Sequence, residues 1–338
     1  MWNADKIVYR NDDSFVRAYQ GSELVWEKSI SNNKIYYTSS DGQIVTPDIG
    51  TGEESKGFGA NIVSNTYSGG RGVIVFDGPV TKIGYTAFGR CNTLQTIVIP
   101  DSVTSIGSYA FSYCERLTSI TIPDSVISIG KNAFFSCERL TSITIPNGIT
   151  SIDIGVFENC SSLTTITIPD SVTSIGMSAF FSCERLTSIT IPDSVTSIGD
   201  SVFNYCSSLT SITIPDGVTS IGQHTFYGCT SLTSITIPDS VKRIDIGVFE
   251  RCTSLLSITI PFSVRDIKFN AFKDCSQLSE VIVNAVTPPE LYPEQYTGIY
   301  DQFENNAPGR KIKVPAESLQ AYKTKIGWRD YADSIVAQ

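Results

Sequence analysis

A strict 23-residue period is the feature that most constrains how this chain of 338 residues can fold. One unit runs from Cys91 to Tyr113 with the sequence CNTLQTIVIPDSVTSIGSYAFSY, and the chain repeats it without insertion or deletion. Cysteine recurs at positions 91, 114, 137, 160, 183, 206, 229, 252 and 275, and proline at 100, 123, 146, 169, 192, 215, 238 and 261. A fixed period of this length predicts a solenoid, in which each unit forms one coil that packs against its neighbours.

The residue pattern within one unit predicts a strand, a corner and a short turn. Residues 96–99, Thr-Ile-Val-Ile, alternate with period 2, so Ile97 and Ile99 should face inward. Pro100 ends the strand because proline cannot donate to a sheet ladder. The segment from Gly107 to Phe111 is long enough for one helical or 3₁₀ turn that packs Phe111 inward. Stacked coils should pair their strands into a parallel sheet with a spacing of about 4.8 Å.

The recurring pattern C-x-x-L-x-x-I-x-I-P-x-x-V-x-x-I-G-x-x-A-F spans about residues 74 to 283. It resembles the BspA-like, Treponema-type leucine-rich repeat of bacterial and some protist surface proteins. This resemblance implies an α/β solenoid, a leucine-rich-repeat horseshoe with the parallel β-sheet on its concave face and short helical turns on its convex face. It also implies a location at the cell surface or outside the cell, roles in adhesion or host interaction, and no shared catalytic residue.

The departures from the period predict three regions: an N-terminal β-hairpin cap over 1–67, a solenoid of about ten coils over 68–283, and an α/β cap over 284–338. Within the first region, one hairpin is expected from residues 15–19 and 23–27 around Gly21, and a second from 34–38 and 43–45. Residues 46–59 are expected to form a loop. The stretch from Ser68 to Arg90 keeps the phase of the repeat and should be the first coil.

The C-terminal region should cover the last coil, because an open sheet edge is prone to pair with other chains. Residues 311–314 predict a terminal strand and Pro315 opens a predicted helix that ends near Lys325. Trp328, Tyr331 and Ile335 then offer a bulky apolar face. Residues 291–306, which contain three tyrosines, are expected to form a loop.

The composition excludes several classes of partner. The formal net charge is −9 and there is no cluster of Lys or Arg, which argues against nucleic acid and against anionic lipid surfaces. No apolar run approaches the length of about 18 residues needed to span a membrane, and no apolar signal-peptide segment follows the first residues. We expect a monomer that needs no cofactor.

The nine cysteines share one phase of the repeat, which predicts a column of buried thiols. Neighbouring coils would satisfy the Cα distance of a disulfide, but parallel Cβ vectors suit its dihedral poorly, and the number is odd. Disulfides therefore remain an alternative. A metal site is disfavoured, because the chain has no C-x-x-C pair and a single histidine.

Other candidates for chemistry have structural interpretations. His224, the single histidine, should be a solvated surface residue without a triad partner. The Glu-Arg pairs at 115–116, 138–139 and 184–185 should form a charged, exposed rim. Two segments of sequence IDIGVFE place Asp153 and Asp245 where most repeats have glycine. They lie four repeats apart, so they cannot form a carboxylate pair for acid-base catalysis.

The outward strand positions offer the best candidate for binding. They carry hydroxyl side chains in seven consecutive coils, namely Ser119, Thr121, Ser142, Thr144, Thr165, Thr167, Ser188, Thr190, Ser211, Thr213, Ser234, Thr236, Ser257 and Thr259. Threonine also favours exposed strands for structural reasons alone. As a functional surface, this uncharged hydroxyl field would suit a protein or glycan. Its uniformity argues against a pocket for one small molecule.

The favoured function is therefore a non-enzymatic binding scaffold for protein interaction or cell-surface adhesion through this face, with no catalytic, cofactor or metal residues. A second possibility is an assembly component, because the segment AYQGSELVWEK is similar to strand-turn-strand tags of some phage tail proteins. An ice-binding solenoid would also use a regular Ser/Thr-x-Thr array, but it needs a flat face. An enzyme would need unlike polar residues that interrupt the repeat at one place, and the sequence suggests no such cluster.

Overall fold

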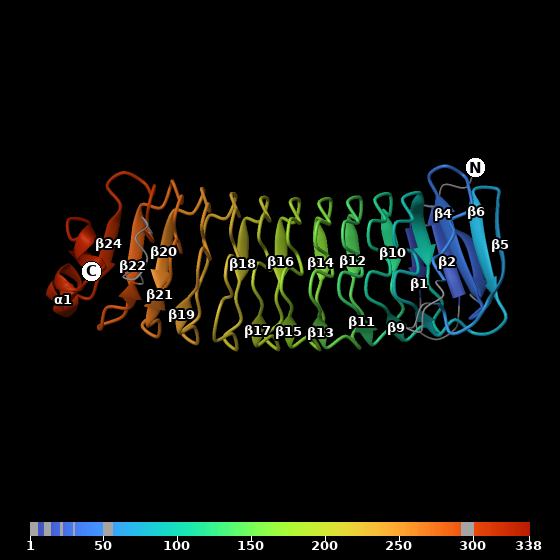
Figure 1. Ribbon diagram of the computed structural model, residues 1–338, viewed down its shortest axis with the longest axis horizontal. Coiled ribbons are helices and arrows are strands. Elements are labelled where there is room, and N and C mark those ends of the chain that lie inside the picture. Colours follow the sequence, from blue (N-terminus) through green and yellow to red (C-terminus); the bar gives the residue numbers. More distant parts are fainter. Residues whose placement is uncertain (1–5, 10–14, 21–22, 30, 50–56, 292–300) are drawn as a thin grey trace.

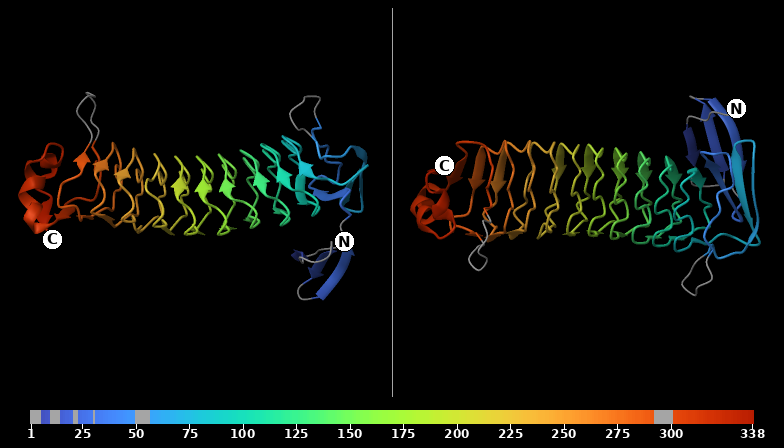
Figure 2. Two further views of the ribbon diagram at one scale, coloured as in Figure 1. Left: turned by 90° about the horizontal axis from the view of Figure 1, so that it is seen from below. Right: turned by 45° about the horizontal axis from the view of Figure 1, so that its top comes forward.

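The computed structural model describes residues 6–9, 15–20, 23–29, 31–49, 57–291 and 301–338. Successive coils stack into an elongated rod, with strand-rich structure at its N-terminal end and a small helical cap at its C-terminal end (Figure 1). The row of coils bends only gently in the two views of Figure 2. The face that carries the main strands is therefore nearly flat.

Each regular coil contributes to two parallel ladders. The main ladder pairs residues 23 positions apart, such as Thr165 with Ser142, and the second ladder does the same for Ser174 with Ser151. The main ladder contains β8 (Leu94–Val98), β10 (Ser119–Thr121), β12 (Ser142–Thr144), β14 (Thr165–Thr167), β16 (Ser188–Thr190), β18 (Ser211–Thr213), β20 (Ser257–Ile260) and β22 (Glu280–Val283). The second contains β7 (Lys82–Ile83), β9 (Ser105–Ile106), β11 (Ser128–Ile129), β13 (Ser151–Ile152), β15 (Ser174–Ile175), β17 (Ser197–Ile198), β19 (Arg243–Ile244), β21 (Asp266–Ile267) and β23 (Glu290–Leu291).

The parallel solenoid with its 23-residue spacing is confirmed, but the segments expected as short helical turns are not helices. Alternate amides there bond within the coil and to the next coil: Ala110 N–H donates to Gly107 O, and Tyr109 N–H donates to Lys131 O at 2.9 Å. Tyr109 adopts a left-handed φ of 57°. A regular helix would direct every N–H along its own axis, so the alternation replaces helical bonding with cohesion between coils.

The interior consists of stacked columns of like residues. Ten phenylalanines, one per coil, stack with ring centroids 5.4–5.7 Å apart and planes within 12° of parallel, namely Phe88, Phe111, Phe134, Phe157, Phe180, Phe203, Phe226, Phe249, Phe272 and Phe303. The strand isoleucines and the repeat leucines form parallel columns beside them and are buried, except Ile166, which is half-buried. This burial of apolar side chains across every coil interface is what holds the stack together.

The N-terminal end departs from the expected two hairpins. The first hairpin is confirmed, since β2 (Phe15–Gln20) pairs antiparallel with β3 (Glu23–Ser29), and β1 (Lys6–Tyr9) joins β2. The second is wrong: β4 (Lys34–Ser39) has no partner strand at residues 43–45. It lies antiparallel between β8 and β6 (Arg71–Phe76), and β6 pairs in turn with β5 (Ile62–Ser68). A non-repeating strand therefore separates the strand of the degenerate first coil from the main ladder, while β7 of that coil still pairs with β9.

The C-terminal end contains the expected strand, helix and apolar cover. The strand β24 (Lys311–Val314) extends the main ladder, and β25 (Ile335–Ala337) pairs with it. Between them lie η1 (Ala316–Ser318), α1 (Leu319–Thr324) and η2 (Trp328–Tyr331). Trp328 is fully buried against the end of the stack, and its Nε1–H donates to Pro289 O at 2.8 Å.

The expectation of a loop over residues 291–306 is wrong in its last part, and residues 292–300 lie outside the described structure. Phe303 continues the phenylalanine column, and Phe272 N–H donates to Gln302 O at 2.9 Å, as in the regular coils. Glu280 pairs with Lys311 rather than with a residue 23 positions on, so the last coil contains an insertion.

Candidate functional site

The fourteen predicted hydroxyl residues form one continuous field along the main ladder, which we call the Ser/Thr face. Thirteen of their side chains are exposed and Thr121 is half-buried. Ladder pairs and single bridges hold most neighbouring coils in register, including Ser188 with Ser211 and Thr236 with Thr259, whereas β10 and β12, and β14 and β16, are not paired. The strands β12 to β18 that carry the centre of this face appear as a row in Figure 1.

The hydroxyls of the Ser/Thr face are free, whereas those of an adjacent column are used within the fold. Thr164 Oγ1–H donates to Thr141 O at 3.1 Å, and Thr210 Oγ1–H donates to Thr187 O at 3.3 Å. None of the fourteen side chains of the Ser/Thr face bonds to another residue within the described part of the chain. The threonine column next to the face therefore contributes to stacking, while the face itself retains unused donors and acceptors.

The cysteine column is buried as expected, with Cys91 half-buried at the start and the other eight thiols inside the stack. All nine are free, and each buried thiol donates to the carbonyl of a phenylalanine one coil earlier, for example Cys160 Sγ–H to Phe134 O at 3.2 Å. Burial raises the pKa of the Cys160 thiol to about 12. Such thiols are poor nucleophiles and have a structural role.

The other sequence candidates lie apart from one another. The Glu-Arg pairs are exposed, as predicted. His224 is half-buried rather than fully solvated, because its ring packs edge-on against Tyr227 at 5.7 Å. Its φ of 54° identifies the site as one of the left-handed turn positions, where histidine is more tolerated than most residues. The left-handed backbone conformation at this position is therefore a sufficient structural reason for a histidine there.

The second ladder is interrupted between β11 and β13, where Asp153 replaces the usual glycine. Gly176 in the next coil donates its N–H to Ile152 O at 2.7 Å, but no matching bond joins Asp153 N–H to Ile129 O among the described residues. A Cβ on Gly176 would lie 2.8 Å from the backbone of the preceding coil, so this position has little room for a side chain. Instead, Asp153 Oδ1 accepts the N–H of Ile154 at 2.7 Å.

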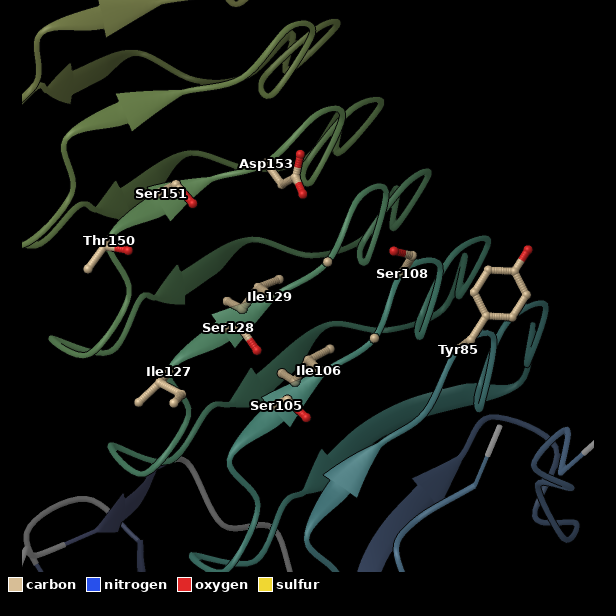
Figure 3. Close-up of a pocket in the computed structure, with 12 residues that line it drawn as sticks. Tyr85, Ser105, Ile106, Ser108, Ile127, Ser128, Ile129, Thr150, Ser151 and Asp153 are labelled. Atoms are coloured by element: carbon tan, nitrogen blue, oxygen red, sulfur yellow. The ribbon is translucent and has the colours of Figure 1, made fainter. Parts of the chain in front are cut away.

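A groove of about 730 Å³ lies over this interruption (Figure 3). Serines of β9, β11 and β13 line its centre, with Ile127 and Thr150 along one side and Tyr85, Ser108 and Asp153 along the other. The sequence prediction noted Asp153 but treated it only as half of an impossible catalytic pair. The overlooked signal was the replacement of glycine by aspartate in a column where neighbouring backbones approach closely.

The geometry defines a parallel β-solenoid with a gently bent, hydroxyl-rich face and a groove over the unpaired strands β11 and β13. The model of the BspA type leucine rich repeat region matches residues 72–187 and 173–288 in six copies, which together cover well over half of the chain. The chain therefore belongs to the BspA-type leucine-rich repeat family. No curated protein matches it.

Several solved structures are similar to the chain. A leucine rich repeat protein of T. pallidum is 32% identical, with a TM-score of 0.44, over 47% of this chain and 77% of the other. A leucine rich cell surface protein of Faecalibacterium prausnitzii is 26% identical, with a TM-score of 0.38, over 96% and 99% of the two chains. A leucine-rich repeat protein of Bacteroides ovatus is 21% identical, with a TM-score of 0.43, over 100% and 99%.

The described residues include no helix that is long and apolar enough to cross a membrane. The same residues bring together no group of three or more His, Cys, Asp or Glu side chains that could hold a metal ion. The Ser/Thr face and the groove at Asp153 are therefore the two surfaces whose geometry most invites a functional interpretation.

Proposed function

We propose that this protein is a non-enzymatic binding scaffold that holds a protein partner on the Ser/Thr face. The observation that carries the proposal is the field of fourteen outward hydroxyl side chains, which repeat in register and have no hydrogen-bond partner in the described structure. Uncharged donors and acceptors spread over seven coils suit an extended protein surface better than a compact substrate. Membership of a leucine-rich repeat family supports a binding scaffold, and the similar Faecalibacterium prausnitzii protein is described as a cell surface protein.

The test replaces Thr167, Thr190 and Thr213 with lysine together, which places three like charges on the Ser/Thr face. Capture of surface and mucosal proteins by the wild-type chain is compared with capture by the triple variant. We expect the partner to be lost from the triple variant and wild-type binding to depend weakly on salt, because hydroxyl contacts carry no net charge. Undiminished binding by a folded variant would contradict the assignment of this face.

A matched control places the same three charges on the second ladder. Thr173, Thr196 and Thr219 are exposed, and the same column already carries Lys242 and Arg265. Their replacement by lysine therefore changes the net charge equally in a column that already accepts basic side chains, and it also removes the bond from Thr173 Oγ1–H to Thr150 O, so the stability of both variants is measured beside binding. We expect this control variant to retain the partner, and equal loss from both variants would indicate a general charge effect instead of a local contact.

Ice binding is the second candidate, because the gentle bend of the stack leaves the Ser/Thr face nearly flat (Figure 2). A flat, regular hydroxyl array is the geometry that this function requires. Thermal hysteresis of the purified chain separates the two candidates. Hysteresis that disappears in the triple lysine variant would favour ice binding, and its absence in the wild type would leave the protein scaffold.

A further inference from the structure

We propose that the groove at Asp153 is a second binding site, separate from the Ser/Thr face, that takes a short neutral oligosaccharide. The groove lies on the second ladder, and its volume of about 730 Å³ is within the range of ligand sites. It lies where β11 and β13 are unpaired and Asp153 replaces glycine, so it is a local feature of the surface. The groove therefore differs from the uniform Ser/Thr face, which offers no pocket for a single small ligand.

The groove presents both kinds of hydrogen-bonding group that sugar hydroxyls need. The hydroxyls of Ser108, Ser128 and Thr150, among others that line it, have no partner in the described part of the chain. Asp153 uses Oδ1 for the N–H of Ile154, which leaves Oδ2 as an acceptor. A carboxylate oxygen accepts stronger hydrogen bonds from hydroxyls than a neutral oxygen does. Free hydroxyls and one carboxylate together can bond to adjacent hydroxyl groups of a sugar.

Two apolar side chains give the groove surfaces for the C–H faces of a sugar ring. Tyr85 packs edge-on against Tyr109 at a centroid distance of 5.9 Å, and its own side chain remains 37% exposed. Ile127 is 64% exposed in a column that is threonine in most coils. An exposed aromatic ring next to polar groups is suited to a ligand that is apolar on one face and polar at its edges.

The dimensions and charge of the groove select the class of sugar. The coils that contribute Tyr85 and Asp153 are three steps apart, which is about 14 Å at the spacing of parallel strands and matches a short oligosaccharide. No Lys or Arg lines the groove, and Asp153 brings one negative charge. The chain also carries a net charge of −9. An acidic sugar would meet repulsion there, and a lone carboxylate that already accepts a backbone N–H is a weak site for a basic one, so a neutral ligand fits best.

The test is an NMR titration of the full chain with a panel of neutral trisaccharides, made of glucose, xylose, mannose or N-acetylglucosamine, and one trisaccharide that contains glucuronate. We expect at least one neutral member to bind with a Kd of about 1 mM or tighter, with shift changes confined to residues 85–153. Binding of no neutral member, or tighter binding of the acidic one, would overturn the proposal.

The variant Asp153→Gly restores the glycine of the repeat and should close the groove. It is expected to weaken binding by at least about tenfold, which corresponds to 1.4 kcal/mol. Asp245→Gly is the matched control, because the same segment recurs four coils away and outside the groove, and it should bind like the wild type. Equal affinities of the two variants would overturn the proposal.

A second pair of variants tests the aromatic contact without changing the ladder. Tyr85→Ala is expected to weaken binding by about tenfold, and Tyr205→Ala removes an exposed tyrosine of a distant coil as its control. Affinity unchanged by Tyr85→Ala would contradict the role of the ring. Triple lysine substitution of the Ser/Thr face should leave sugar binding intact, so failure of this proposal and failure of the protein scaffold are distinguishable.

Discussion

The junction between β13 and β15 and the junction between β11 and β13 have the same 23-residue spacing but different exteriors. At the first, two strand pairs and the bond from Gly176 to Ile152 join the coils. At the second, these contacts are missing and the groove opens. The interior does not follow this difference, since Phe157 stacks at 5.6 Å on Phe134 and at 5.5 Å on Phe180. The core therefore sets the stacking, and the exterior ladder can be interrupted without breaking the solenoid.

Lys268 sharpens this comparison because it also occupies the glycine column. It keeps its backbone bond to Ile244 at 2.9 Å, and β21 remains paired with β19. A Cβ alone therefore does not interrupt the ladder. At Asp153 the side-chain carboxylate also accepts the next backbone N–H, and β11 and β13 are not paired. Asp245 makes the same local bond, but Ile244 there keeps a single bridge to Ile221 of the preceding coil.

The largest effect should come from the interior, which both junctions share. Phe157→Ala and Phe180→Ala each remove a fully buried ring, so each should lower the free energy of unfolding by about 3–5 kcal/mol. The two losses should agree, because the phenylalanine column is continuous across the interruption. Urea denaturation of both variants measures them, and a much smaller loss for Phe157→Ala would show that the interruption extends into the core.

A smaller effect is expected when the regular junction is made to resemble the interrupted one. Gly176→Asp places a Cβ 2.8 Å from the backbone of Asp153, so the coils must shift. The free energy of unfolding should fall by about 1–3 kcal/mol. The control is Gly42→Asp in the N-terminal region, where a Cβ would meet nothing but the φ of 70° disfavours most side chains. If Gly176→Asp costs less than this control, the close approach in the glycine column is not the limiting contact.

The rate of thiol labelling should differ between the eight buried cysteines and Cys91, which is half-buried at the end of the column. At pH 8 we expect Cys91 to react first with a thiol reagent, and the other eight to react only as the protein unfolds. Burial raises the pKa of both Cys91 and Cys160 to about 12, so few thiolates exist at this pH. Mass spectrometry after timed labelling identifies the sites. Rapid native labelling of Cys137 or Cys160 would contradict a closed interior at the interrupted junction.

The smallest effect concerns Glu158 of the interrupted coil, whose pKa is raised by burial. A carboxyl with a raised pKa in the folded state stabilises the fold below its unfolded pKa, and this contribution is lost as pH rises through the folded pKa. Glu158→Gln should therefore slightly increase the free energy of unfolding at pH 7 and change it less near pH 4. Denaturation at both pH values provides the measurement, with Glu184→Gln on the exposed rim as control. A decrease at pH 7 would show that the ionised side chain stabilises the coil.

Much of the fold could be predicted, because apolar residues that recur at the same position of every repeat must lie inside the stack. Cysteine and proline each keep one phase and isoleucine keeps three, so the interior and the outward positions follow from a single coil. The strand at β4 was predicted but its partners were not, since its antiparallel place between β8 and β6 depends on residues that do not repeat. Phe303 was hidden because an insertion displaces it from the period, and its neighbours lack the usual alanine and cysteine.

The backbone conformation of the turns and the position of the groove could not be predicted from the repeat pattern. Tyr109 and Tyr113 are residues that usually avoid a left-handed φ, so their backbone conformation is imposed by the bonds between coils. The groove depends on a single substitution, Asp153, within an otherwise intact coil. The sequence identified that substitution, but its consequence appears only when the distance between neighbouring backbones is known.

Amide hydrogen exchange, resolved by residue, most directly tests the claim that Asp153 interrupts the second ladder. In the wild-type chain, the amides of Thr150 and Asp153 should exchange quickly, and those of Thr173 and Gly176 slowly, because only the latter pair donates to the preceding coil. In Asp153→Gly, the amide at position 153 should become as protected as that of Gly176. Slow exchange at Asp153 in the wild type, or no gain of protection in the variant, would contradict the account.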